Sequence, residues 1–232
     1  MKAVIFDMDG VIVDTEPYNM ERVYEYVLSL NPQAKREDIY QNAGRVKQDV
    51  WTRIAAVIGL GRGWEETMID YRQNWVPYHP FEIPYRKIFR EETITILKWA
   101  RGQGMKTAVA SSTAYDKVME ILTETGVVSY LDLILSGEFF EKSKPEPAIY
   151  LKAAELLGVE PKDCVAIEDS TVGITAGHRA GLNVIALIDD RFGFDRSLAD
   201  AEAASLGEVI EKIQTEFLSG NRCDCEGTEQ LL

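Results

Sequence analysis

Short apolar runs alternate with longer segments of helical periodicity over most of this chain. Runs at residues 3–6, 106–110, 131–135, 164–167 and 183–187 are rich in apolar and β-branched residues and have the length of buried strands. The segments between them repeat their apolar residues at helical spacing, which predicts helices. These predicted helices occupy residues 92–101, 115–125, 148–157 and 171–180, and a closing helix is predicted at 206–218. Strands separated by single helices predict βαβ units, and therefore an α/β core with a doubly wound parallel sheet.

Residues 16–85 follow the first predicted strand and carry a different pattern. Apolar residues recur there at helical spacing, near residues 20–28, 50–58 and 68–75, and no segment shows a convincing strand pattern. We therefore expect a helical-bundle cap inserted into the core directly after the first strand. The predicted division of the chain is an α/β core at 1–15 and 86–218, a helical cap at 16–85, and a flexible polar tail at 219–232.

The composition is that of a folded protein with an acidic surface. Of the 232 residues, 46% are hydrophobic and 27% are charged, and the formal net charge is −13. Such a charge repels nucleic acid and anionic membranes, and no apolar run is long enough to cross a bilayer. The first apolar run is interrupted at Asp7, so it does not resemble a secretory signal. We expect a cytoplasmic protein without nucleic-acid or membrane partners, either a monomer or a homodimer.

Polar side chains gather where the predicted strands end. In open α/β sheets, ligands bind outside the carboxyl ends of the strands, so the residues at those ends share one edge. Carboxylates directly after a buried apolar run need a cation or a proton, because burying unpaired charge is costly. The residues at this edge are Asp7 and Asp9 after the first strand, Ser111 and Ser112 after the second, Lys144 beyond the third, and Glu168 and Asp169 after the fourth.

This set of residues suits phosphoryl transfer assisted by Mg²⁺. Mg²⁺ prefers oxygen ligands, and Asp7 and Asp169 offer carboxylate oxygens for it. Asp7 can attack phosphorus to give an aspartyl-phosphate, while Asp9 can protonate the leaving oxygen and later deprotonate water. Ser111 and Lys144 can hold the phosphoryl oxygens, where most of the catalysis of such a transfer lies.

Four ordered motifs in this chain resemble those of the haloacid dehalogenase superfamily. They are DMDGV at residues 7–11, a strand that ends in Ser111, Lys144-Pro145, and IEDS at residues 167–170. The phrase DGVIVDTE, with a helical insertion directly behind it, is similar to the subgroup with a four-helix-type cap. That subgroup includes sugar-phosphate phosphatases and β-phosphoglucomutase.

The resemblance implies a role for each matching residue. Asp7 would be the nucleophile, and Asp9 the general acid and base. The implied metal ligands are Asp7, Asp9 through its backbone carbonyl, Asp169, and Glu168 at or just behind the metal. The implied phosphate-binding residues are Ser111 with its neighbour Ser112, and Lys144. An acid at Asp9 favours phosphate chemistry over dehalogenation, which needs no such group.

The resulting prediction is a Mg²⁺-dependent phosphatase that hydrolyses a small phosphorylated metabolite, such as a sugar phosphate, through an aspartyl-phosphate. β-Phosphoglucomutases of this subgroup generally carry a histidine where Asn19 stands and an arginine where Lys47 aligns, which weakens the mutase alternative. Asn19 and Lys47 remain candidate cap residues that contact substrate. A more remote alternative is a non-catalytic phospho-acceptor module. The sequence leaves the substrate open.

Overall fold

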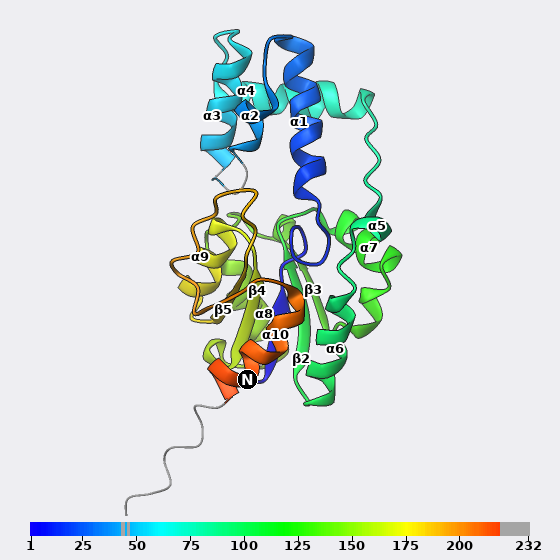
Figure 1. The fold of residues 1–232 in the computed structure, drawn as a ribbon, viewed down its shortest axis with the longest axis vertical. Helices are drawn as coiled ribbons and strands as arrows, with labels where there is room; N and C mark the ends of the chain where they lie inside the picture. The colour runs from blue at the N-terminus through cyan, green and yellow to red at the C-terminus, as the bar shows by residue number, and fades with distance from the viewer. Residues whose placement is uncertain (43–44, 46, 219–232) are drawn as a thin grey trace, which may run out of the picture.

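The computed structural model describes residues 1–42, 45 and 47–218, and its core is a single six-stranded sheet (Figure 1). The tail at 219–232 lies outside the described residues. The strands are β1 (Ala3–Phe6), β2 (Lys106–Ser111), β3 (Leu133–Ser136), β4 (Cys164–Glu168), β5 (Asn183–Leu187) and β6 (Ala201–Ala203). Their order is β3-β2-β1-β4-β5-β6, and every neighbouring pair is parallel. This confirms the predicted α/β class; the short β6 was not predicted, because three residues show no apolar run.

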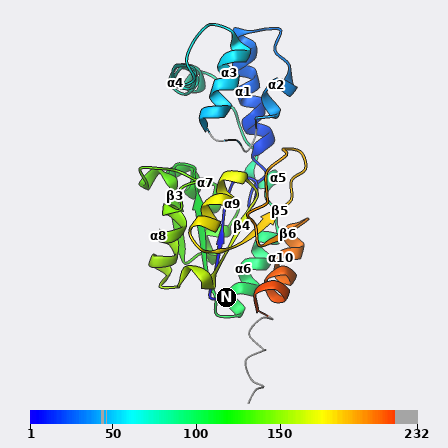
Figure 2. The ribbon, with the colours of Figure 1, turned by 90° about the vertical axis from the view of Figure 1, so that its left-hand side faces the viewer.

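The central strand β1 is fully buried and divides its side chains between two apolar layers. Val4 and Phe6 pack on one face of the sheet, while Ala3 and Ile5 pack on the other, as the alternation of a strand requires. Figure 2 shows α8 on one side of the sheet and α6 and α10 on the other. The helices on the first face are α6 (Glu92–Gly102), α7 (Tyr115–Glu124) and α10 (Leu206–Lys212), and those on the second are α8 (Ala148–Leu157) and α9 (Thr171–Arg179).

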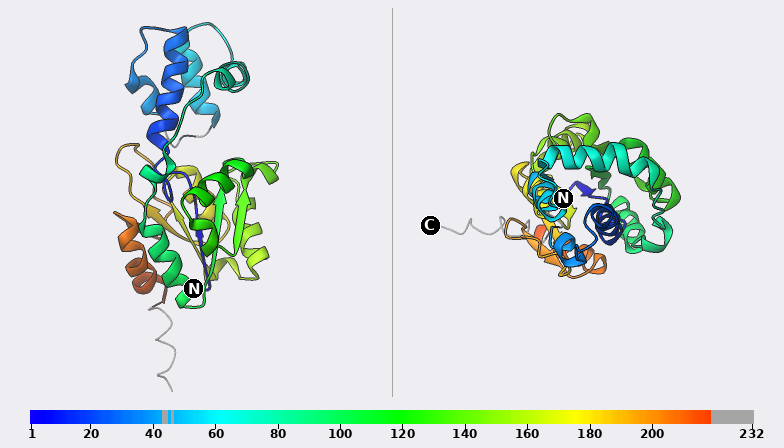
Figure 3. Two further views of the ribbon diagram at one scale, coloured as in Figure 1. Left: turned by 90° about the vertical axis from the view of Figure 1, so that its right-hand side faces the viewer. Right: turned by 90° about the horizontal axis from the view of Figure 1, so that it is seen from above.

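A separate group of helices, here called the helical unit, stands above the carboxyl ends of the strands (Figures 1 and 3). It comprises α1 (Glu16–Leu30), α2 (Arg36–Tyr40), α3 (Lys47–Ile58) and α4 (Trp64–Ile69), continued by a π-helical turn at Asp70–Trp75 and a 3₁₀ turn at Val76–Tyr78. Tyr26, Ile39 and Ile54 are fully buried in its own apolar core. None of the described helices is long and apolar enough to cross a membrane.

Two adjacent linkers join the helical unit to the core. Val13 in the first linker forms an antiparallel bridge with Phe89 in the second, which follows the short helix α5 (Tyr85–Ile88). The Arg90 amide donates to the Ile12 carbonyl at 2.9 Å, so the two linkers are hydrogen-bonded side by side. The helical unit therefore leaves and re-enters the core at one place, next to the end of β1.

The loop after β5 makes a further contact between the core and the helical unit. Phe192 and Phe194 lie with ring centroids 5.6 Å apart, and each is 7% exposed. Both pack against Met20 and Tyr40 of the helical unit. This contact covers apolar surface from both parts, so it stabilises the arrangement in which α1 faces the ends of the strands.

We expect the buried face of α6 to contribute strongly to stability. Leu97 is fully buried, so Leu97→Ala should lower the free energy of unfolding by about 2–5 kcal/mol through lost burial and the cavity left behind. Leu156 on α8 is 54% exposed, and Leu156→Ala should change it by less than about 0.5 kcal/mol. Urea denaturation followed by circular dichroism measures both. Equal losses would contradict the assignment of these faces.

Candidate active site

Asp7 directly follows β1 and is largely enclosed by the protein. Its amide donates to the Ile167 carbonyl at 3.0 Å, which extends the β1–β4 ladder by one residue, and its side chain is mostly buried. The chain then turns at Gly10, whose φ is +81°. A Cβ on Gly10 would lie 1.9 Å from Oδ2 of Asp169. Glycine is therefore required here both by the backbone conformation and by the nearby carboxylate.

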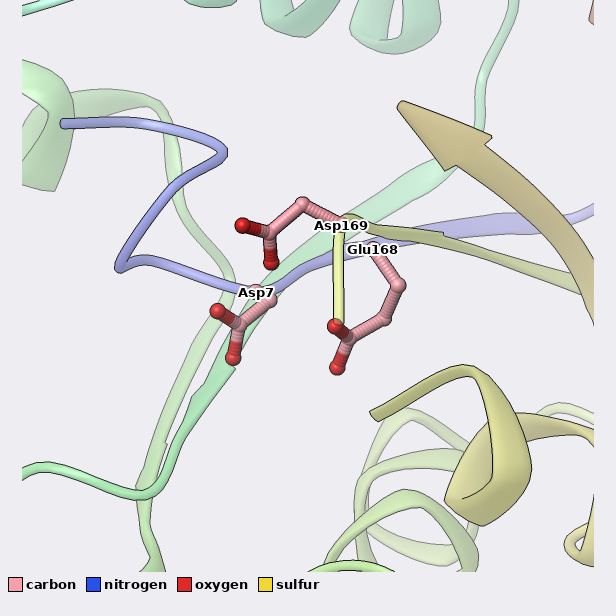
Figure 4. A group of neighbouring side chains, drawn as sticks. All are labelled: Asp7, Glu168 and Asp169. Carbon is pink, nitrogen blue, oxygen red and sulfur yellow. The ribbon is translucent and has the colours of Figure 1, made fainter. Parts of the chain in front are cut away.

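Three buried carboxylates meet at this edge: Asp7, Glu168 and Asp169 (Figure 4). Each offers an oxygen, and these oxygens all lie within 4.8 Å of one another. Asp169 is 3% exposed, yet its carboxylate accepts no hydrogen bond and forms no ion pair within the described part of the chain. Burial, reinforced by the neighbouring carboxylates, raises the pKa of Asp169 well above its ordinary value. An ionised Asp169 therefore needs a cation, and its oxygens are free to bind one.

Lys144 lies among these carboxylates, and its side chain is only 4% exposed. Its Nζ donates to Oδ1 of Asp7 at 2.6 Å, to Oε1 of Glu168 at 2.6 Å and to the Ala110 carbonyl at 2.9 Å. Burial alone would lower the pKa of Lys144, but the charges of Asp7 and Glu168 outweigh it and hold that pKa well above its ordinary value. Burial raises the pKa of Asp7 to about 8, against the opposing effect of Lys144. The lysine stays charged here and binds two of the three carboxylates.

Glu168 points away from Asp169, although the two residues are adjacent (Figure 4). Besides Lys144, its Oε1 accepts a hydrogen bond from the Tyr150 hydroxyl at 2.6 Å. A Cβ at Gly173, in the first turn of α9, would lie 2.0 Å from this carboxyl group. Within the described residues, Oε2 of Glu168 accepts only from the Ser170 hydroxyl, at 3.3 Å, so Oε1 carries most of the bonds that Glu168 makes within the protein. Sequence reasoning missed Tyr150 and Gly173, because both are ordinary residues of apolar helices until the fold places them beside Glu168.

Asp9 lies outside the group of three carboxylates and is held by hydroxyls. Its Oδ1 accepts from Thr15 Oγ1 at 2.7 Å, and its Oδ2 accepts from Thr113 Oγ1 at 2.8 Å and weakly from Ser111 at 3.5 Å. Ser111 is fully buried and also accepts from the Thr113 amide at 3.0 Å, so it shapes the turn after β2. Ser112, in contrast, lines the cavity above Asp7.

A cavity of about 260 Å³ lies between this edge and the helical unit. From the core it is lined by Asp7, Asp9, Ser112, Lys144, Asp169, Ser170 and Val172, and from the helical unit by Glu16, Met20, Asn42, Arg45 and Val50. Asn19 and Lys47 are not among its lining residues: Asn19 is half-buried on α1, and Lys47 is exposed at the start of α3. Helical periodicity did not distinguish Asn19 from Glu16 and Met20, because residues three and four apart share a face.

This chain is similar to a family of hydrolases and to several known proteins. The family model described as haloacid dehalogenase-like hydrolase matches residues 1–181, which include every residue of the site described above. Hexitol phosphatase B of Escherichia coli (strain K12) is 31% identical over 228 residues, covering 90% of this chain and 95% of that protein. The chloroplastic protein SUPPRESSOR OF QUENCHING 1 of Arabidopsis thaliana is 28% identical over 188 residues, covering 81% of this chain, which spans only 18% of that longer protein.

Among solved structures, β-phosphoglucomutase from Clostridium difficile superposes with a TM-score of 0.74 at 22% identity, covering 95% of this chain and 98% of that one. At this identity the match concerns the fold alone, and it agrees with the six-stranded parallel sheet. The family model spans the four motifs and the inserted helical unit together. This chain belongs to the haloacid dehalogenase-like hydrolases.

Proposed function

We propose that this protein is a Mg²⁺-dependent phosphatase that hydrolyses a phosphorylated sugar or sugar alcohol through an aspartyl-phosphate on Asp7. The observation that carries the proposal is the buried group of three carboxylates with a single lysine, at the carboxyl edge of a doubly wound sheet. The relative named hexitol phosphatase B, which matches over nearly its whole length, supports the substrate class.

The carboxylates fit a divalent cation. Three buried carboxylates against one buried lysine leave an excess of negative charge, which a divalent ion would offset. Asp7 and Asp169 would hold the ion, and Glu168 would lie at or just behind it. The reason is that Oε1 of Glu168 is bound by both Lys144 and Tyr150, whereas on Asp7 the lysine binds only Oδ1. The backbone carbonyl of Asp9 remains a predicted further ligand. When bound, Mg²⁺ would reduce the repulsion between the carboxylates and an anionic phosphate.

The reaction follows from the different surroundings of Asp7 and Asp9. The Asp7 carboxylate would form a bond to phosphorus while the bond from phosphorus to the sugar oxygen breaks. Asp9, positioned by Thr15 and Thr113, would give its proton to the leaving oxygen and later take a proton from the water that hydrolyses the aspartyl-phosphate. Lys144, whose Nζ lies 2.6 Å from Oδ1 of Asp7, would bind a phosphoryl oxygen in exchange for one of its three present acceptors.

The helical unit would act as the cap of this site. Glu16, Met20, Asn42 and Arg45 line the cavity from above, opposite the reacting carboxylates. These side chains would select the organic part of the substrate and limit the access of bulk water. The paired linkers are the natural boundary between cap and core, close to the predicted divisions at residues 15 and 86.

A mutase must return the phosphoryl group to a second sugar hydroxyl, and so must hold a phosphorylated intermediate against the cap. Asn19 and Lys47, the positions aligned with mutase residues, do not line the cavity. This favours transfer of the phosphoryl group to water. A phospho-acceptor module would need a long-lived aspartyl-phosphate, whereas Asp9 would deprotonate the water that hydrolyses it.

Lys144 should be needed for the fold as well as for phosphate. Lys144→Met would leave Asp7 and Glu168 buried without their cation, and should lower the free energy of unfolding by about 3 kcal/mol, as measured by urea denaturation. Lys142, two residues away, is exposed, and Lys142→Met should leave stability within about 0.5 kcal/mol of the parent. Comparable changes in the two variants would count against the buried ion pairs.

Turnover should depend on Asp7 and on the metal. With Mg²⁺, we expect release of phosphate from at least one sugar or sugar-alcohol phosphate in a panel of monoesters. Asp7→Asn should lower that rate by at least about a thousand-fold, because the nucleophile is lost. EDTA should abolish turnover, and added Mg²⁺ should restore it. Activity that survives Asp7→Asn would overturn the assignment of the nucleophile.

The products distinguish hydrolysis from mutase chemistry. With β-glucose 1-phosphate as substrate, any turnover should yield glucose and inorganic phosphate, because the cavity lacks the side chains aligned with those of mutases. Phosphorus NMR of the reaction mixture distinguishes inorganic phosphate from glucose 6-phosphate. Accumulation of glucose 6-phosphate would replace the phosphatase proposal with the mutase.

A further inference from the structure

A buried asparagine of the helical unit is among the residues that line the active-site cavity. Asn42, just after α2, is 0% exposed and lines the same cavity as Asp7. Its Nδ2 donates to the Asp38 carbonyl at 2.8 Å. Its Oδ1 is buried and has no hydrogen-bond partner within residues 1–42, 45 and 47–218. A buried acceptor without a partner is costly, and such groups are uncommon in folded proteins.

The orientation of this amide is set by its neighbour. A backbone carbonyl can only accept, so the nitrogen of Asn42 must face Asp38 and the oxygen must face the other way. Four other buried side-chain atoms in the described part of the chain lack partners, and none of their residues lines the cavity. They are Arg22 Nε, Trp75 Nε1, Arg90 Nε and Thr93 Oγ1. Asn42 is thus the unpartnered group that a bound substrate could satisfy.

The surroundings restrict what that partner can be. Oδ1 of Asn42 is an acceptor, and Asp7, Asp9 and Asp169 line the cavity from the core. An anionic group beside this oxygen would therefore be repelled, and it has no proton to donate to the oxygen. Arg45 also lines the cavity, but it is exposed and its Nε donates to the Gln41 carbonyl at 3.3 Å. The buried position is therefore suited to a neutral donor, and a hydroxyl is the donor that sugars and sugar alcohols carry.

We infer that Asn42 determines specificity, because its Oδ1 accepts a hydrogen bond from a hydroxyl on the non-reacting part of the substrate. This rests on the proposed function and deepens it: the site selects hydroxylated phosphate esters over phosphorylated acids and over esters of plain alcohols. A site built to bond a hydroxyl discriminates strongly against an analogue that lacks it, because the buried acceptor is then left unpaired.

Binding of two matched probes tests this inference. Sorbitol 6-phosphate carries a hydroxylated six-carbon chain, and n-hexyl phosphate carries the same chain length without hydroxyls. Calorimetric titrations with Mg²⁺ use the Asp7→Asn protein, which prevents turnover. Adding Asn42→Leu removes the acceptor at similar volume. It should weaken sorbitol 6-phosphate binding by about ten-fold or more and change hexyl phosphate binding by less than about two-fold.

Thr67→Val is the matched structural control, because Thr67 is also buried in the helical unit but lies outside the cavity. It should leave both affinities unchanged. The melting temperature of Asn42→Leu should stay close to that of its parent, because the lost bond to Asp38 is offset by removal of an unpaired oxygen.

Several outcomes would overturn the role of Asn42: an unchanged affinity for sorbitol 6-phosphate, an equal loss for both probes, or no binding of either probe before the change. The proposed function fails separately, if the unaltered protein hydrolyses no monoester although sorbitol 6-phosphate binds with the expected dependence on Asn42.

Discussion

The site depends on the hydrogen bonds that the ammonium group of Lys144 makes. A lysine has three N–H donors, and each finds an acceptor here: Asp7, Glu168 and the Ala110 carbonyl. These acceptors stand at the ends of three adjacent strands, β1, β4 and β2. Because removing any one would leave buried charge or an unused donor, the lysine fixes how the three strand ends lie relative to one another. The parallel sheet brings the strand ends to one edge, and Lys144 links the groups at that edge by hydrogen bonds.

Little space is available around the buried carboxylates. Asp169 fits only because Gly10 has no Cβ, and Glu168 fits only because Gly173 has none. Glu168 and Asp169 are neighbours in sequence, but strand alternation sends them in different directions. Glu168 turns toward Lys144 and Tyr150, while Asp169 faces the cavity without a protein partner. An acidic pair that looks redundant in the sequence is therefore divided between one carboxylate that binds the lysine and one that is left available for the proposed cation.

The sequence was sufficient for the class of fold and for the residues that the strands carry. Strand periodicity and the rule for parallel sheets place Asp7 and Asp169 at one edge without any knowledge of side-chain contacts. The same reasoning could not find Tyr150, whose hydroxyl matters only because α8 packs beneath Glu168. It also named Asn19, from the resemblance, and did not name Asn42. Which helical residues face the cavity depends on how the linkers and the loop after β5 orient the helical unit, and no local pattern encodes that orientation.

Asp7 and Asp9 have contrasting surroundings, which would allow one short turn to provide the two chemical roles proposed above. Asp7 lies among buried charges, and burial raises its pKa to about 8, so it needs cations beside it to act as a carboxylate. Asp9, two residues further on, is held by the hydroxyls of Thr15 and Thr113 instead. Hydroxyl donors stabilise its geometry without committing it to a charged partner, and a group held in this way can exchange a proton with substrate or water. Thr15 lies in the first linker and Thr113 in the core, so the position of Asp9 also depends on where the helical unit leaves the sheet. In the proposed reaction, the acid–base step would thereby depend on how the helices that line the cavity are attached to the core.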